Sequence, residues 1–313
     1  MLTEWRGLLA HGEPHTIYQL ESRSIYERQS YKGKVINGQA MNEQVMSKPA
    51  AHLNWTSVVP PMRYANVPTV GARYWTAISL ASVFGCNLGD FVSLYLHWGH
   101  WLGLFPLAVI FAALVAGERH SAHFTEAWYW AVVIVLRTAA TNIADLATHT
   151  FEWPYPRVIL GLAVIQALVI LPVLPRLVQS GSDRTGRPAT DGWYWISLLT
   201  AGALGTAIGD WVAEDLHLGT GGGTLMLGAV FAVILAIGSG SRWTTKASYW
   251  LAIIAVRSAG TTAGDWLAFR EEPGLSNGLH LGLPLSTAFT CALFVGTLFL
   301  WRARSSFTAG DAK

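Results

Sequence analysis

Four segments of this sequence share one pattern, in which a Tyr-Trp pair is followed by an Asp 15 residues after the Trp. The Asp residues are separated by 55, 65 and 55 residues. A small residue lies directly before each Asp, another lies five positions before it, and Cys or Thr lies four positions before it. This spacing predicts four copies of a unit of about 55 residues. The four Asp residues are Asp90, Asp145, Asp210 and Asp265, and the pairs are Tyr74-Trp75, Tyr129-Trp130, Tyr194-Trp195 and Tyr249-Trp250.

The composition indicates that these units lie in a membrane. Of all residues 52% are hydrophobic and only 13% are charged, whereas a soluble domain has about 25% charged residues. Apolar segments of roughly membrane-spanning length follow one another without the alternation of barrel strands. We therefore expect an all-α polytopic membrane protein with eight transmembrane helices, two in each repeat. The expected segments are about 74–96, 101–117, 127–149, 157–174, 193–213, 222–240, 247–268 and 279–301.

The four repeats are expected to form two pseudo-symmetric halves, because the ten extra residues fall in a polar linker in the middle of the chain. Arg137 and Arg257 each lie eight residues before an Asp, and His97 and His217 each lie seven after one. An axis along the membrane normal would relate such halves. The predicted divisions are a polar tail at 1–66, membrane half one at 67–178, the linker at 179–192, membrane half two at 193–302 and a C-terminal tail at 303–313.

The distribution of basic residues predicts that both termini are cytoplasmic. The Tyr-Trp pairs would then form an aromatic belt at the inner interface, and each Asp would lie about 22 Å further along its helix. Only Arg157 and Arg270 fall in the hairpins within repeats. The basic residues between repeats and in the flanks are Arg63, Arg73, Arg119, Arg176, Arg184, Arg187, Arg242, Lys246, Arg302, Arg304 and Lys313.

Four acids at equivalent depths are too costly to face lipid, so we expect them to converge inside the bundle. Residues three or four positions apart share a helix face. Carboxylate, amide and hydroxyl oxygens suit hard cations, which predicts a cation or proton site. The alternative is that these polar groups only hold helices together. The expected polar partners of the four Asp residues are Asn87, Asn142, Thr206 and Thr261 or Thr262.

Arg137 and Arg257 are the other charges expected within the membrane. Two Arg against four Asp leave two negative charges in excess, which protons or a bound cation would balance. Alternatively, each Arg forms a structural ion pair with an Asp of a neighbouring helix, or the arginines contact an anionic substrate.

Other ligand classes find less support. His97, His149 and His217 are candidate metal ligands, although their spacing matches no zinc signature. No nucleophile elbow or Ser-x-x-Lys element points to an enzyme, and axial haem ligands are lacking, so we predict no catalytic activity and no cofactor apart from a bound cation. A net charge of +2 gives no reason to expect nucleic-acid binding.

The Tyr-Trp pairs and the Gly- and Thr-rich runs that end in the four Asp residues resemble a family of bacterial integral membrane proteins. These are built from four tandem copies of a repeat of unknown function and are often labelled membrane-anchored proteins. The resemblance covers residues 73 to about 302. It implies two membrane spans in each repeat and a location in the bacterial cytoplasmic (inner) membrane. Family members usually carry a further acid in the run, where this chain has Asn87, Asn142, Ala207 and Thr262.

The sequence as a whole favours a secondary transporter or permease for a small cation, either a metal ion or one coupled to protons. Its partners would be the lipid bilayer and that cation or proton, and a homo-oligomer is left open. The alternative is a non-transporting membrane scaffold or sensor, in which the Asp, Arg and Thr side chains only stabilise the bundle.

Overall fold

The computed structural model describes residues 67–120, 126–171, 190–238, 247–269 and 278–310. The predicted tail at 1–66 and most of the linker at 179–192 lie outside these residues. Every regular element within the described ranges is a helix, which confirms the all-α class.

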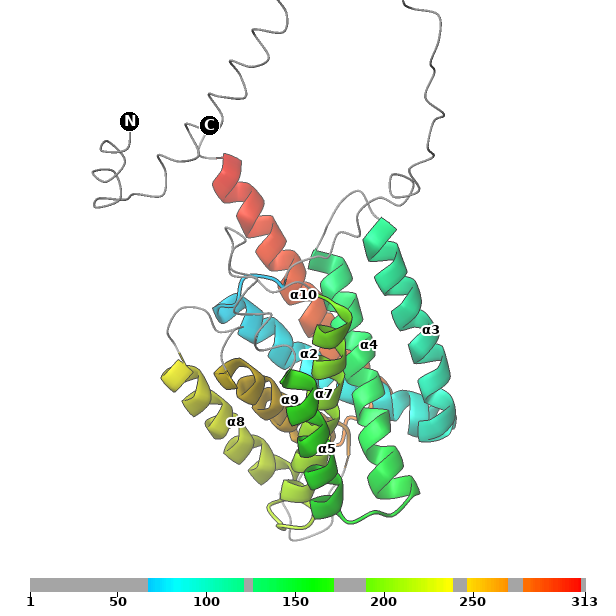
Figure 1. Ribbon diagram of the computed structural model, residues 1–313. Coiled ribbons are helices and arrows are strands. Elements are labelled where there is room, and N and C mark those ends of the chain that lie inside the picture. Colours follow the sequence, from blue (N-terminus) through cyan, green and yellow to red (C-terminus); the bar gives the residue numbers. More distant parts are fainter. Residues whose placement is uncertain (1–66, 121–125, 172–189, 239–246, 270–277, 311–313) are drawn as a thin grey trace, which may run out of the picture. The chain divides into compact units, whose positions relative to one another are not determined.

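Eight α-helices are described, and their positions agree with the eight apolar segments expected from the sequence (Figure 1). Short π-helical segments, η2 and η3, continue α2 and α4 directly after Asp90 and Asp145. The last helix extends through Gly310, so no helix end separates the membrane half from the expected tail at 303–313. The elements are α2 (Ala72–Asp90), η2 (Phe91–Tyr95), α3 (Gly99–His120), α4 (Glu126–Asp145), η3 (Leu146–Thr150), α5 (Tyr155–Ile170), α7 (Gly192–Ala213), α8 (Gly219–Gly238), α9 (Ala247–Ala268) and α10 (Leu283–Gly310).

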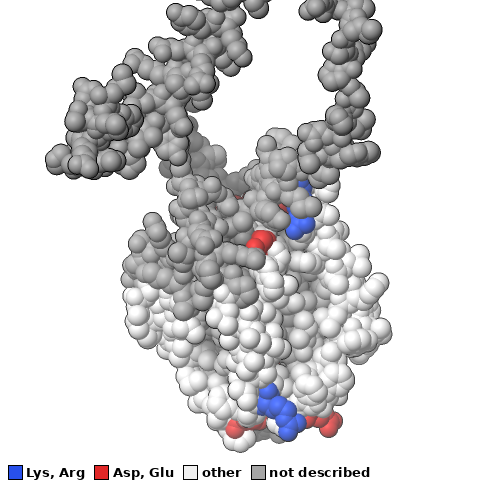
Figure 2. Space-filling view, viewed as in Figure 1, with Lys and Arg blue, Asp and Glu red and all other residues white. Residues whose placement is uncertain are grey.

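Six of the described helices are long and apolar enough to cross a membrane, as expected of a multi-pass membrane protein. α5 is apolar but shorter, and α9 carries Arg257 and Asp265. Figure 2 shows the described charged side chains of one face near the two ends of the bundle, with uncharged residues between them. The six spans are Ala72–Tyr95, Gly99–His120, Glu126–Thr150, Gly192–Ala213, Gly219–Gly238 and Leu283–Trp301.

The helices form an inner and an outer layer. The inner helices α2, α4, α7 and α9 pack in a closed ring in chain order, with α9 against α2. In the apolar spans of α2, α4 and α7, 56–78% of residues are buried, against 11–22% for the outer helices α3, α8 and α10. Each outer helix packs mainly on the inner helix that follows it in the chain, and α10 closes the circle by packing on α2.

Four tyrosines form a closed hydrogen-bonded ring near the N-terminal ends of the inner helices. The hydroxyl oxygens of Tyr74 and Tyr129 lie 3.0 Å apart, those of Tyr129 and Tyr194 2.8 Å, those of Tyr194 and Tyr249 3.0 Å, and those of Tyr249 and Tyr74 2.7 Å. Each hydroxyl can therefore donate to one neighbour and accept from the other. The ring satisfies four buried polar groups without water.

The tryptophans complete this aromatic cluster. Tyr74 packs edge-on against Trp75 and also against Trp130 of the next inner helix, and the other three tyrosines repeat this arrangement around the ring. The tyrosines are at most 2% exposed and the four tryptophans at most 7%. The predicted aromatic belt at the membrane interface is therefore wrong, because both rings of every pair are buried between helices.

The small residues five positions before each Asp allow the inner helices to approach closely. A Cβ added to Gly85 would lie 2.5 Å from Cγ of Arg137, and one added to Gly205 would lie 2.5 Å from Cβ of Arg257. A Cβ on Gly260 would clash with Cβ of Ser82. The three contacted residues, Arg137, Arg257 and Ser82, each lie eight positions before the Asp of the next inner helix in the ring. The same helix–helix contact is therefore repeated around the ring. Small residues commonly allow such approach in membrane bundles.

Tyr249→Phe should destabilise the bundle by about 1–3 kcal/mol, because Tyr74 and Tyr194 would each lose a buried hydrogen-bond partner. Replacing all four ring tyrosines by Phe should destabilise the protein by less than four times that amount, since no unpaired hydroxyl remains. Thermal unfolding in detergent micelles measures both effects, with the exposed Tyr95→Phe as control. Strictly additive losses would contradict a cooperative ring.

Gly85→Ala should destabilise the protein by about 1–3 kcal/mol, because the added methyl group overpacks the contact with Arg137. Gly161→Ala on α5 is the matched control, since an added Cβ meets nothing within 4 Å there. Because alanine favours a helix more than glycine does, Gly161→Ala should leave the free energy of unfolding unchanged or raise it by up to about 1 kcal/mol. Equal melting temperatures for the two variants would argue against a tight contact between α2 and α4.

Candidate functional site

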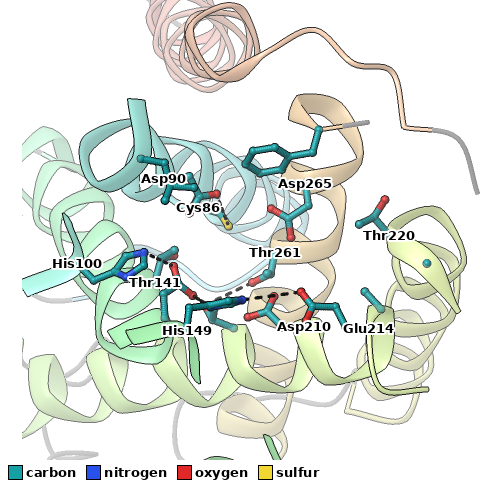
Figure 3. Close-up of a pocket in the computed structure, with 16 residues that line it drawn as sticks. Cys86, Asp90, His100, Thr141, His149, Asp210, Glu214, Thr220, Thr261 and Asp265 are labelled. Atoms are coloured by element: carbon teal, nitrogen blue, oxygen red, sulfur yellow. Dashed lines mark hydrogen bonds and ion pairs between the residues drawn. The ribbon is translucent and has the colours of Figure 1, made fainter. Parts of the chain in front are cut away.

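One cavity of about 440 Å³ lies at the C-terminal ends of the inner helices, and all four motif Asp residues line it (Figure 3). It opens to the surface on the side where His149 and Glu214 are exposed. The structure thus brings together four acids that are up to 175 residues apart in the chain. The lining residues are Cys86, Asp90, Leu94, His100, Thr141, Asp145, His149, Thr206, Asp210, Ala213, Glu214, Gly219, Thr220, Thr261, Asp265 and Phe269.

Among the described residues, the carboxylates of the cavity form no direct ion pair with arginine or lysine. Asp90, Asp145 and Asp210 are only 6–7% exposed. Within the described part of the chain, no Arg or Lys nitrogen lies within 4.0 Å of any of the four Asp residues. The alternative of an Arg–Asp structural lock, drawn from the sequence, is therefore wrong. Asp145 instead lies 3.9 Å from Nε2 of His100 and 3.9 Å from Nδ1 of His149.

Arg137 joins all four inner helices and bonds to three threonines that line the cavity. From α4, its Nε donates to the carbonyl oxygen of Ser82 on α2 at 3.2 Å. Nη1 donates to the hydroxyls of Thr206 on α7 at 2.6 Å and Thr141 on its own helix at 3.0 Å. Nη2 donates to the hydroxyl of Thr261 on α9 at 2.6 Å. The three threonines lie four positions before their Asp residues, so their hydroxyls separate the guanidinium from the carboxylates.

Arg257, at the equivalent position of α9, is fully buried and differs from Arg137. Its Nε and Nη1 have no hydrogen-bond partner among the described residues. Its carbonyl oxygen accepts from Nη2 of Arg137 at 3.4 Å and from the hydroxyl of Thr261 at 3.1 Å. The two arginines therefore contribute differently, because the guanidinium of Arg137 donates to three hydroxyls that line the cavity, whereas Arg257 contacts Thr261 through its backbone carbonyl.

The predicted polar partners divide into two groups. Thr206 lines the cavity, whereas Asn87, Asn142 and Thr262 do not. Thr262 accepts a hydrogen bond from Thr224 of α8 at 3.1 Å. The site of a Cβ on Gly103 of α3 lies 3.3 Å from the amide nitrogen of Asn142. The side chain of Asn87 has no hydrogen-bond partner among the described residues, and its carbonyl oxygen accepts from Thr287 of α10. Asn142 and Thr262 thus face outer helices, whereas Oδ1 of Asn87 lies 2.6 Å from the site of a Cβ on Gly264 of the inner helix α9. The positions four before the Asp face the cavity.

Of the three histidines predicted as metal ligands, only one lies at the cavity. His149 lines the cavity, where its Nε2 lies 4.0 Å from Oε1 of Glu214. His97 and His217 do not line it, and both have positive φ, at 57° and 54°. Glu152 and His280 have the same left-handed conformation at the corresponding turns. The recurrence of His97 and His217 therefore follows from a shared turn, for which histidine is one of the favoured non-glycine residues.

Sequence reasoning missed several residues at the cavity. Cys86 and Thr141 line it, and their position four before the Asp was the available signal. His100 also lines it, with Nδ1 3.0 Å from the hydroxyl of Thr150. Near the rim, the hydroxyl of Tyr155 donates to Glu214 at 2.7 Å. His100, Tyr155 and Glu214 lie on outer helices or in a turn, and no argument about helix faces joins them to the inner ring.

Comparison with known families supports the repeats in the second half of the chain. Residues 193–243 and 248–306 each match a family described as Repeat of Unknown Function (DUF347). These matches contain α7 with α8 and α9 with most of α10, so each covers one inner and one outer helix. No curated protein and no solved structure matches the chain.

Arg137→Lys should lower the stability of the bundle, because an ammonium group cannot reproduce a fork that bonds to three other helices. Each charge-assisted hydrogen bond that is lost should reduce the free energy of unfolding by about 1.5–3 kcal/mol. The control is Arg73→Lys, whose ion pair with Glu126 at 3.3 Å is solvent-exposed and should contribute less than about 1 kcal/mol. A melting temperature of Arg137→Lys equal to that of the control would contradict this role.

Proposed function

We propose that this protein is a secondary transporter or permease that binds a small cation in the four-Asp cavity and carries it across the membrane. One observation carries the proposal: four carboxylates from four helices line a single open cavity, without an arginine or lysine partner within 4.0 Å among the described residues. Uncompensated acids at membrane depth are expensive. A metal ion, or protons that exchange with it, would balance them.

The arrangement of the helices supports a finer architecture. We infer that all eight helices cross the membrane as four two-helix repeats. Six of them are clearly long and apolar enough, and α5 and α9 would be the other two membrane-spanning helices. The recurring contacts of Gly85, Gly205 and Gly260 relate successive inner helices by a similar rotation. Two halves joined by the linker at 179–192 would then share an axis along the membrane normal.

The proposed orientation follows from the basic residues. Cytoplasmic termini in a bacterial inner membrane place the tyrosine ring toward the cytoplasm. The acidic cavity then opens on the opposite side, where the turns containing His97 and His217 lie. A cation would therefore enter this conformation from outside the cell.

The closed axis favours a transporter over an open channel. Beyond the carboxylates, the Arg137 network and the tyrosine ring both block the axis with saturated hydrogen bonds. A bound cation could reach the other side only if the inner helices rearranged. Alternating access of this kind is typical of transporters built from repeats.

A non-transporting scaffold or sensor is the second candidate. The tyrosine ring and the Arg137 network support it, because both are hydrogen-bonded devices that hold the inner helices together. They do not account for an open cavity in which Oδ2 of Asp210 lacks a hydrogen-bond partner among the described residues. A cation flux that depends on the cavity carboxylates separates the two candidates.

Asp90→Asn and Asp210→Asn, each made separately, should lower cation uptake into proteoliposomes by about 10-fold or more, since each removes a candidate ligand with little change of shape. Uptake of metal ions and of protons would be followed with fluorescent indicators inside the vesicles. Asp215→Asn is the matched control, because Asp215 is exposed and does not line the cavity. Unchanged uptake in both cavity variants would refute the mechanism and leave the scaffold.

A further inference from the structure

One corner of the cavity carries a donor set that differs from the rest. The Sγ atom of Cys86 and carboxylate oxygens of Asp90 and Asp265 all lie within 4.8 Å of one another. Cys86 and Asp90 come from α2 and Asp265 comes from α9, so the group spans one interface of the inner ring. Figure 3 shows the three side chains converging on the cavity between these helices. We propose that they bind a divalent transition-metal ion of the Zn²⁺ type.

Cys86 is available for such a site because it takes no part in the Arg137 network. The three other inner helices have Thr141, Thr206 and Thr261 at this position, and all three hydroxyls accept hydrogen bonds from Arg137. The thiol of Cys86 instead lies 4.0 Å from Oδ2 of Asp90. The ring is therefore asymmetric, and its one sulfur atom faces carboxylates.

The geometry fits a small metal ion. Zn²⁺ binds Cys sulfur at about 2.3 Å and carboxylate oxygen at about 2.0–2.2 Å in a tetrahedral arrangement, so two ligand atoms of one ion lie roughly 3.5 Å apart. The three atoms, which lie within 4.8 Å of one another, would have to move closer together by about 1 Å to bind one ion. A thiolate with two carboxylates prefers Zn²⁺-like ions, whereas Mg²⁺ and Ca²⁺ require six or more oxygen ligands.

A second observation points to a ligand in the same cavity. Asp210 is only 7% exposed, and its Oδ2 atom has no hydrogen-bond partner among the described residues. A buried carboxylate oxygen without a partner is costly unless a cation or a proton satisfies it. Asp210 thus supplies further negative charge to a cation held by the other three side chains.

The assignment rests on the proposed function, because it names the class of cation that the cavity takes. The test uses the purified full chain in detergent micelles, kept reduced and titrated with Co²⁺ as the probe. A thiolate ligand gives a near-ultraviolet charge-transfer band with Co²⁺. We expect this band in the wild type, and we expect Zn²⁺ but not excess Mg²⁺ to abolish it.

Cys86→Thr is the decisive variant, because threonine occupies the equivalent position of the other three inner helices. It should lack the band, whereas Cys291→Ser, which alters the other cysteine outside the cavity, should keep it. Asp265→Asn keeps the thiol and should weaken Co²⁺ binding by about 10-fold or more. No band in the wild type, a band that persists in Cys86→Thr, or a band lost in Cys291→Ser would overturn the site.

The outcomes for the two proposals can be told apart. Co²⁺ binding through Cys86 without any cation uptake into proteoliposomes would refute transport but retain the metal site. Uptake that depends on Asp90 and Asp210, with no thiolate band in the wild type, would retain transport and refute this choice of cation.

Discussion

The guanidinium of Arg137 must find its hydrogen-bond acceptors inside the bundle, and much of the structure follows from this requirement. A buried charge without partners is expensive in a protein interior. Its donors are satisfied by a carbonyl oxygen of α2 and by hydroxyls of α4, α7 and α9. The acceptor on α2 comes within reach because Gly85 lets α2 approach α4 closely. Gly85 and Arg137 therefore act together: the small residue brings the helices close, and the charged one joins them by hydrogen bonds.

The polar groups along the axis are arranged in separate layers. Tyrosine hydroxyls pair with one another at one end, Arg137 pairs with threonines in the middle, and the carboxylates face the open cavity at the other end. The tyrosine hydroxyls and the guanidinium of Arg137 find all their partners within the bundle and hold the helices together, although Nε and Nη1 of Arg257 have none among the described residues. The carboxylates face the open cavity, so among the described residues the acidic surface that solution can reach along the axis lies at one end of the ring.

Much of the fold follows from the sequence, because the fixed distance between Trp and Asp places equivalent residues at equivalent heights on four helices. The faces of those helices were harder to predict. At 3.6 residues per turn, positions three and four before an Asp lie on opposite sides of it. Asn87 and Asn142 were expected beside the Asp residues, yet position four, with Cys86 and Thr141, faces the cavity. The burial of Tyr74 was also beyond local reasoning, since a Tyr-Trp pair near a helix end is equally typical of a membrane interface.

The packing of each outer helix on the next inner helix has a consequence for biosynthesis. α3, α5 and α8 are docked against segments made after them, but α10 must return to α2, the first helix described. The circle therefore stays open until α10 has been made, and the groove of α2 that receives Thr287 and Phe294 lacks its cover until then. A chain without α10 would expose this seam, so the docking of α10 on α2 is the step at which quality control can distinguish closed from open bundles.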